Sequence, residues 1–450
     1  MKNSALLLWI IVLAVILRLA LILGVQGHLE RADVRDTATY TEPALKLLKG
    51  EGFISDGFRT PVYPLFIAFF YWLFGKQSLP IILAQIFLSI ATIYMTYLLG
   101  KKLLTNPIAL IAALLLAISV ESITHSFFLL TETLFTALFL GSILTYVLGI
   151  SSKKRIWILC SGLLMGLSIL CRPIAAYFPF IFLFLIIFDK AKGVSERILK
   201  TGIYLASVFM VVVPWILWNQ STIGIPTITL ITDYNLLFYN AASLQANKSG
   251  VEIETVRDNL LEQVEQILRA ENLPDTPANN TAIYHDLAMS IILSDPLRYS
   301  YLHLKNDMNN LLPGVTDISE ILGITTGGKG TLAILNQYGL SAAIRHYFED
   351  KTWLLWVFAP AIILLLLIYL TNFIGIGVLI IDNKWYPLAL ILLPLLYLIL
   401  IPGAASNQRF RVPAMPFFCL LAAQGSVFVW DISTSFLKRL GIIPAVNQKI

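Results

Sequence analysis

The stretch LLLWIIVLAVILRLALILG, residues 6–24, decides the class of this protein. It is apolar throughout except for Arg18, and a run of about 20 apolar residues is what an α-helix needs to cross a bilayer. The run is too long for a signal peptide that is removed after export. We therefore expect an uncleaved first membrane span at residues 5–24.

The composition of the whole chain indicates the same class. Of its 450 residues, 57% are hydrophobic and 13% are charged, and the mean hydropathy is +0.78. Soluble proteins carry about 25% charged residues, so a soluble fold could not hide this much apolar surface. The net charge of +5 does not point to nucleic acid, because the basic residues lie in turns between apolar runs. The sequence predicts an all-α polytopic membrane protein.

Further apolar segments predict a bundle of about ten transmembrane helices. The expected spans are 5–24, 78–100, 107–120, 127–150, 156–171, 174–188, 198–218, 353–381, 385–402 and 412–431. One more apolar stretch, PVYPLFIAFFYWLFG at residues 61–75, begins at Pro61 and is too short to cross. We expect it to lie flat on the outer surface.

Basic residues predict the orientation, because cytoplasmic loops of membrane proteins are enriched in Lys and Arg. If the N-terminus is cytoplasmic, every inner turn is basic; these turns contain Lys2, Lys101, Lys102, Lys153, Lys154, Arg155, Lys190, Lys192, Arg197, Lys200, Lys384, Lys438 and Arg439. We expect a multi-pass protein of the plasma (inner) membrane with both termini cytoplasmic.

This orientation divides the chain into three parts. Residues 1–218 form an N-terminal transmembrane module with a first outer loop at 25–77, and residues 353–450 form a C-terminal one. The block at 219–352 lies outside the cytoplasm, and its polar helical patterns predict a mostly helical domain. In that block Asp295 precedes Pro296, which is typical of a helix N-cap followed by proline in the first turn.

The unusual polar residues gather on the predicted outer side, in separate loops. They are Asp33, Asp36, Tyr40, Glu121, His125, Glu132, Arg172, Arg409 and Arg411. Ionisable groups at membrane depth are costly and usually face a cavity or a partner. Arginine binds phosphate through a planar fork of donors, and a carboxylate can take a proton from an attacking hydroxyl. The pattern predicts a site for an anionic, amphipathic ligand such as a sugar carried on a lipid phosphate.

At these residues the chain resembles the GT-C superfamily of polyprenyl-phosphate-dependent glycosyltransferases, near the protein O-mannosyltransferases and the aminoarabinose lipid A transferases. The resemblance covers residues 5–220 and 385–430. The motifs that carry it are Asp36 with Tyr40 and ALKLLKGEGF, RTPVYPLFIAFFYWLFG, LTETLF with Glu132, LCRP with Arg172, and RFRVPAMPF. One departure is that Asp36 is followed by Thr37, where several members have a second acid. Residues 219–352 match no family motif.

The resemblance implies a transferase that moves a sugar from a polyprenyl phosphate to an extracytoplasmic glycolipid, polysaccharide or protein, with inversion. It implies Asp36 as the general base and Glu132 as a second acid at the catalytic centre. Tyr40 is expected to line the same pocket, and Arg172, Arg409 and Arg411 are expected to bind the donor. The expected partners are the lipid-linked donor, the acceptor and membrane lipids, without nucleic acid, metal or cofactor.

Asp36 and the three arginines also have plainer interpretations. Asp36 can cap the helix that starts near Thr39 or pair with Arg31 or Arg35, and Asp33 is the nearest rival base. Arg172, Arg409 and Arg411 can anchor the bundle at the lipid headgroups. Cys160, Cys171 and Cys419 lack metal-ligand spacing and are expected in the core.

Two other functions stay open from the sequence. A flippase or carrier of lipid-linked saccharides would also need an apolar bundle, although carriers usually place polar residues near mid-membrane in both halves. An O-antigen ligase-type transferase would share the arginines and use catalytic residues from a later loop. Polar residues clustered at one interface favour the polyprenyl-phosphate transferase.

Overall fold

The computed structural model describes residues 2–25, 27–34, 36–53, 57–152, 154–187, 193–324, 331–349 and 351–439. Arg35 and the expected inner-turn residues Lys153, Lys190 and Lys192 lie outside these ranges. The described chain is made of helices and turns, and no strand occurs in these ranges. The predicted all-α fold is confirmed.

Within the described ranges, six helical segments are long and apolar enough to cross a membrane. They are α1 (Lys2–Gly24), α4 (Ser78–Leu103), α7 (Glu132–Ser151), α10 (Val194–Ile223), α18 (Trp353–Ile381) and α20 (Met415–Arg439), the last counted together with the turn before it. Their length and composition confirm a polytopic membrane protein.

Shorter apolar helices correspond to the remaining expected spans. They are α5 (Asn106–Ala117), α8 (Ile156–Cys171), α9 (Phe178–Ile187) and α19 (Trp385–Leu400), and the stretch after Pro61 forms α3 (Val62–Phe74). Each has 10 to 16 residues, which is below the usual spanning length. The number of ten spans therefore stays a prediction, and so does the flat position of α3.

One predicted helix begins later than expected. Residues 127–150 read as a single apolar run, but α7 starts at Glu132 and residues 127–131 form turns. Phe127 and Leu129 are buried in these turns, and the Leu129 N–H donates to the Ala32 carbonyl at 2.9 Å. Hydropathy cannot separate a buried turn from a helix, because both are apolar and only the backbone partner differs.

The region between α10 and α18 is helical as expected. It contains α11 (Ile231–Asn235), α12 (Ala242–Ser249), α13 (Ile253–Ala270), α14 (Pro277–Leu293), α15 (Pro296–Asp307), α16 (Val315–Ile321) and α17 (Thr331–Tyr347). The Asp295 side chain accepts from the Arg298 N–H, so the predicted N-cap is confirmed. A separate apolar core, which includes Leu237, Leu260 and Ala288, joins α12–α14. Because α10 runs on to Ile223, the expected domain boundary at 218 falls inside a helix.

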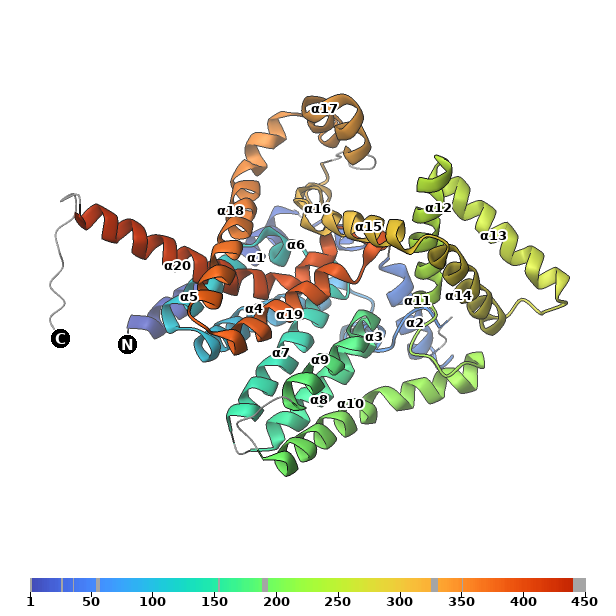
Figure 1. Ribbon diagram of the computed structural model, residues 1–450, viewed down its shortest axis with the longest axis horizontal. Coiled ribbons are helices and arrows are strands. Elements are labelled where there is room, and N and C mark those ends of the chain that lie inside the picture. The colour runs from blue at the N-terminus through green and yellow to red at the C-terminus, as the bar shows by residue number, and fades with distance from the viewer. Residues whose placement is uncertain are drawn as a thin grey trace.

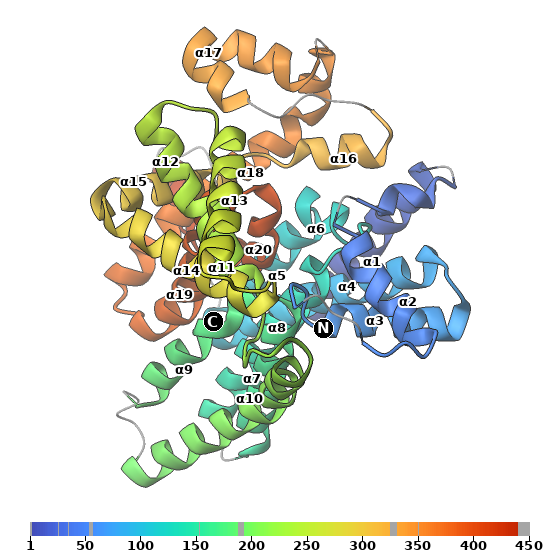
Figure 2. The ribbon, with the colours of Figure 1, turned by 90° about the vertical axis from the view of Figure 1, so that its right-hand side faces the viewer.

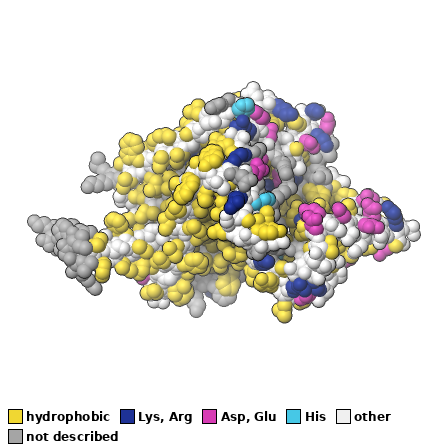
Figure 3. Space-filling view, turned by 90° about the horizontal axis from the view of Figure 1, so that it is seen from above, with side chains coloured by type: hydrophobic (Ala, Val, Ile, Leu, Met, Phe, Trp, Pro, Cys, Tyr) yellow, Lys and Arg dark blue, Asp and Glu magenta, His cyan; other side chains and the backbone are white. Residues whose placement is uncertain are grey.

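Helices α12–α14 lie at the end of the molecule opposite the start of α1 and the end of α20. α1 begins and α20 ends on the left of Figure 1, whereas α12, α13 and α14 lie on the right. Figure 2 views the molecule from the side of α12–α14. In the space-filling view, hydrophobic side chains cover the left of the molecule and charged side chains gather in the middle and on the right (Figure 3).

A close helix crossing holds the C-terminal half together. A Cβ added to Gly425 would lie 2.0 Å from the Thr371 carbonyl oxygen, and one on Gly375 would lie 2.1 Å from that of Leu421. The Asn372 amide donates to the Phe418 carbonyl at 2.9 Å. Glycine is required at this α18–α20 contact because the two backbones touch. The crossing sets the position of the turns η5 (Gly403–Ala405) and η6 (Gln408–Ala414) that lead into α20.

Candidate functional site

Asp36 lies between the short turn η1 (Leu29–Ala32) and α2 (Ala38–Leu48), and two arginines meet its carboxylate. Arg409 Nη1 donates to Asp36 Oδ2 at 2.6 Å, and Arg59 Nη2 lies 3.8 Å from Asp36 Oδ1. The N-cap of α2 is Thr37, which makes no side-chain cap bond, and Arg31 donates to the Ile321 carbonyl. The capping and Arg31 alternatives therefore do not describe Asp36 in this structure.

Thr37 attaches the Asp36 segment to the turn before α7. Its buried hydroxyl donates to the Leu129 carbonyl at 3.2 Å and accepts from the Val34 N–H at 3.0 Å. Together with the bond from the Leu129 N–H to the Ala32 carbonyl, this joins the first outer loop to the segment that presents Glu132. The contact explains how two acids that are 96 positions apart in the chain come to share partners.

Glu132 begins α7 and is almost fully buried. Arg172, at the C-terminal end of α8, donates from Nη1 to Glu132 Oε1 at 2.6 Å. Arg409 Nε lies 3.9 Å from the same oxygen. The position in the first turn of a helix also favours a carboxylate, because the helix dipole is positive there. Arg409 thus lies between the two acids and connects them.

Aromatic rings line this cluster. The Arg172 guanidinium lies 4.9 Å from the ring centre of Phe410, and that of Arg409 lies 5.5 Å from it. Arg59 lies 4.7 Å above the Tyr40 ring, which is buried and packs edge-on against Tyr63. Burial raises the pKa of the Tyr40 hydroxyl, so it stays neutral at physiological pH. The rings hold the guanidinium planes in place through cation–π contacts.

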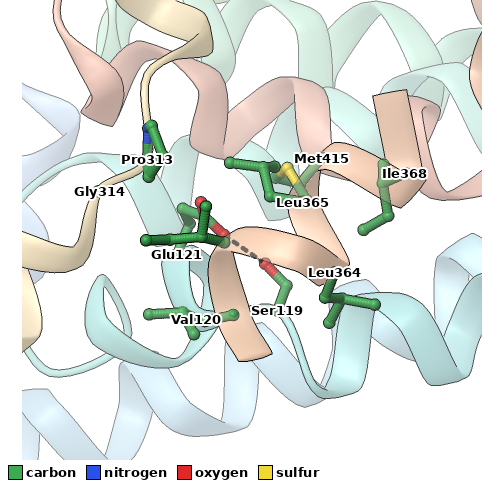
Figure 4. A pocket seen from close by; sticks show the side chains of 11 residues that line it. Ser119, Val120, Glu121, Pro313, Gly314, Leu364, Leu365, Ile368 and Met415 are labelled. Atoms are coloured by element: carbon green, nitrogen blue, oxygen red, sulfur yellow. Dashed lines mark hydrogen bonds between the residues drawn. The ribbon is translucent and has the colours of Figure 1, made fainter. Parts of the chain in front are cut away.

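Arg411 belongs to a second cluster. Its fully buried guanidinium pairs with Glu121 and donates to the carbonyls of Asn310 and Leu312 at 2.8 and 2.7 Å. Glu121 also accepts from the Ser119 hydroxyl at 3.1 Å, and the two face a small cavity whose opposite wall is apolar (Figure 4). That wall includes Leu364, Leu365, Ile368 and Met415. His125 lies next to this second cluster, with its Nε2 3.9 Å from the Asp317 carboxylate.

The structure brings five of the six predicted site residues into one place. Asp36, Tyr40, Glu132, Arg172 and Arg409 share partners around Arg409 and Arg59, whereas Arg411 pairs with Glu121. Sequence reasoning missed Arg59, although it begins the quoted motif RTPVYPLF, and it missed Thr37 and Phe410. Within the described ranges no group of three His, Cys, Asp or Glu side chains is placed to hold a metal ion.

Comparison with known proteins identifies the fold. A family model described as dolichyl-phosphate-mannose-protein mannosyltransferase matches residues 58–218. The oligosaccharyltransferase of Archaeoglobus fulgidus in its apo form is similar over 99% of this chain and 53% of its own, with a TM-score of 0.55 and 12% sequence identity. The chain has the GT-C fold. The resemblance predicted from the motifs is thereby confirmed.

Two further GT-C structures are similar. The archaeal oligosaccharyltransferase AglB from Archaeoglobus fulgidus, in complex with an inhibitory peptide and a dolichol-phosphate, has a TM-score of 0.52 at 13% identity and covers 99% of this chain and 52% of its own. ArnT from Cupriavidus metallidurans, bound to undecaprenyl phosphate, covers 96% and 81% at 13% identity, but its TM-score of 0.41 is too low to establish a common fold. Curated protein sequences give no match.

The matches differ in how much they cover. This chain spans about half the length of the archaeal oligosaccharyltransferases. The family model includes Arg59, Glu132 and Arg172 but neither Asp36 nor Arg409. The GT-C fold therefore applies over nearly the whole chain, whereas the matched sequence range contains only part of the cluster.

Proposed function

We propose that this protein is an integral-membrane glycosyltransferase that moves a sugar from a polyprenyl phosphate to an acceptor on the extracytoplasmic face. The observation that carries the proposal is the single cluster of Asp36, Glu132, Arg59, Arg172 and Arg409, contributed by five separate segments of a GT-C fold. Three guanidinium groups and two carboxylates leave one net positive charge, which suits an anionic ligand.

Arg409 is the proposed main ligand of the donor phosphate. Its Nη1 bonds Asp36, but its Nε is buried and makes no hydrogen bond. A buried donor without an acceptor costs free energy, so a phosphate oxygen next to this group would be stabilised. Arg59 and Arg172 supply further positive charge on either side, and arginine matches phosphate oxygens in a bidentate manner.

The proposed chemistry needs one base and no bound cofactor. The acceptor oxygen attacks the anomeric carbon while Asp36 takes its proton. The bond from the anomeric carbon to the phosphate oxygen breaks, and the polyprenyl phosphate leaves with the electron pair. Attack from the side opposite to the phosphate inverts the anomeric configuration. Asp36 is paired with Arg409 Nη1 in this structure, so the proposal also requires that a phosphate bound at Nε draws Nη1 away and releases the base.

The other predicted residues receive supporting roles. Glu132 is proposed to position Arg172 and Arg409, because its carboxylate is buried against both. Tyr40 is proposed to form the pocket wall beneath Arg59. Arg411 is proposed to hold the η6 turn, rather than donor phosphate, since both of its Nη groups are engaged, by Glu121, two carbonyls and the Tyr369 hydroxyl, and its guanidinium is fully buried, although its Nε makes no hydrogen bond. The modules 1–218 and 353–450 each contribute part of the site, and 219–352 is proposed to select the acceptor.

The test is sugar transfer by the purified protein in lipid nanodiscs. Polyprenyl phosphates carrying single hexoses or pentoses are offered with glycolipid, polysaccharide and peptide acceptors, and products are identified by mass spectrometry. The proposal expects transfer from at least one donor, lost in Asp36→Asn and kept in the matched control Asp33→Asn. Absence of transfer together with Asp36-dependent movement of donor across liposome membranes would instead establish the carrier alternative.

A further inference from the structure

Helix α15 presents its apolar side outward. Leu297, Tyr301 and Leu304 are 85%, 65% and 56% exposed, and Met308, which starts the next turn η4 (Met308–Leu311), is 58% exposed. At 100° per residue these four positions fall within an arc of about 60°. They form one stripe, which we call the α15 stripe, and it consists only of large apolar side chains.

The buried side of the helix combines Leu302, which is 6% exposed, with polar groups that bond the turns before α20. Asp307 is 2% exposed, and its Oδ1 accepts from the Gly403 N–H and the Ser406 hydroxyl, both at 2.8 Å. Asn310 is fully buried and donates to the Ile399 carbonyl at 2.9 Å. A helix on a water-facing surface has apolar residues inside and charged residues outside. With a buried carboxyl at Asp307 and four large apolar side chains outside, α15 departs from this pattern, and we infer that lipid rather than water faces the α15 stripe.

The stripe continues the apolar surface of the membrane bundle. His303 Nε2 donates to the Leu400 carbonyl at 2.9 Å, at the end of α19, and the Tyr369 hydroxyl of α18 donates to the Leu311 carbonyl at 3.0 Å. Next to these contacts, Leu400 and Ile401 are exposed as well. Helix α15 contacts α12, α14 and α19, and Figure 1 shows it between α16 and α12–α14.

A basic residue flanks the stripe. Lys305 is exposed and follows Leu304 directly, so its ammonium group lies at one edge of the apolar arc. An apolar arc edged by lysine is typical of helices that lie in the membrane interface, where the stem stays in the acyl region and the charge reaches the headgroups.

We propose that α15 is an interfacial membrane helix whose stripe lies among the lipid acyl chains on the side of α12–α14. Asp307 then holds the turn at 403–406 at the level of the headgroups. Because Arg409 closely follows this turn, it is held at the same level. A lipid-immersed helix thus positions the loop that carries the proposed phosphate ligand. The inference concerns the surroundings of α15 and does not depend on transfer activity.

The test measures what surrounds the stripe. Nitroxide labels are placed at Tyr301→Cys and Leu304→Cys, with Glu262→Cys on the exposed side of α13 as the control. The background is Cys160→Ser, because Cys171 and Cys419 are buried. In nanodiscs of phosphatidylethanolamine and phosphatidylglycerol, the ratio of relaxation by oxygen to relaxation by a water-soluble nickel complex reports the environment of each label.

The proposal expects an oxygen-to-nickel ratio at 301 and 304 several-fold above that at 262. A ratio equal to that at 262 would mean that the stripe faces water. Protection from both reagents would mean that a second copy or another protein covers it. Either result overturns the proposal, and two label positions guard against a local disturbance. Because the labels report environment and not turnover, failure here leaves the proposed transferase standing.

Discussion

Replacing Asp36 by Asn is expected to tighten donor binding while abolishing transfer. Asp36 and the donor phosphate are proposed to compete for Arg409, so removing the carboxylate charge removes the competitor. Hydrogen bonds to charged groups contribute about 1.5–3 kcal/mol, whereas exposed ion pairs contribute about 0–1 kcal/mol. The Asp36 and Arg409 side chains are 30% and 32% exposed, so we take the ion pair to contribute about 1 kcal/mol. Its removal is therefore expected to lower the dissociation constant of the donor phosphate about fivefold.

The two effects are measured separately on the same preparation. Binding of polyprenyl phosphate without sugar is titrated in nanodiscs for the wild type, Asp36→Asn and the control Asp33→Asn. Turnover is measured with the sugar-bearing donor, and loss of a general base is expected to cost about 10²–10⁴-fold. Donor phosphate that binds Asp36→Asn more weakly than the wild type would refute the competition for Arg409. Near-normal turnover in Asp36→Asn would remove Asp36 as the base.

Three further predictions concern Arg409 with Arg411, the crossing of α18 and α20, and the Asp307 carboxyl of α15. Arg409→Ala is expected to weaken donor binding by about tenfold or more, whereas Arg411→Ala is expected to lower the free energy of unfolding by about 3–5 kcal/mol, because it leaves a buried partner charge unpaired. Gly425→Ala is expected to lower the melting temperature, since its Cβ would lie 2.0 Å from a backbone oxygen, at a cost of about 1–3 kcal/mol or more. Burial raises the pKa of the Asp307 carboxyl, so its stabilising contribution is full at pH below its unfolded pKa and is lost as pH rises through the folded pKa. Wild type should therefore lose stability relative to Asp307→Asn as the pH rises through the mildly acidic range.

Each of these has its own control. Gly377 lies in α18 with nothing within 4 Å of an added Cβ, so Gly377→Ala should not destabilise the protein, and equal melting temperatures for the two alanine variants would contradict the crossing argument. Unchanged stability in Arg411→Ala, with weakened donor binding, would return Arg411 to the phosphate site. A difference between wild type and Asp307→Asn that is constant with pH would mean that the Asp307 carboxyl does not titrate differently on folding.

Local sequence signals were sufficient for the class of the protein and for much of the site. Apolar runs predict membrane helices because spanning length is a property of one segment. Acids and arginines at the expected outer turns stand out in the sequence as candidate site residues, because a charge at membrane depth is costly wherever it lies. Hydropathy alone assigns residues 127–131 to a helix, because it measures burial and not backbone conformation, whereas the structure has turns there.

The pairing of those candidates depended on the packed fold. Asp36 and Arg409 are 373 positions apart, and no local pattern separates Arg409 from Arg411, which lies two residues further on and pairs with Glu121. Arg59 joined the site only because α2 and α3 pack together and direct it over Tyr40. The sequence by itself determined the apolar helices and a set of costly charges. Which charges meet was decided by the tertiary structure, because opposite charges pair at distances that only the packing of distant helices sets.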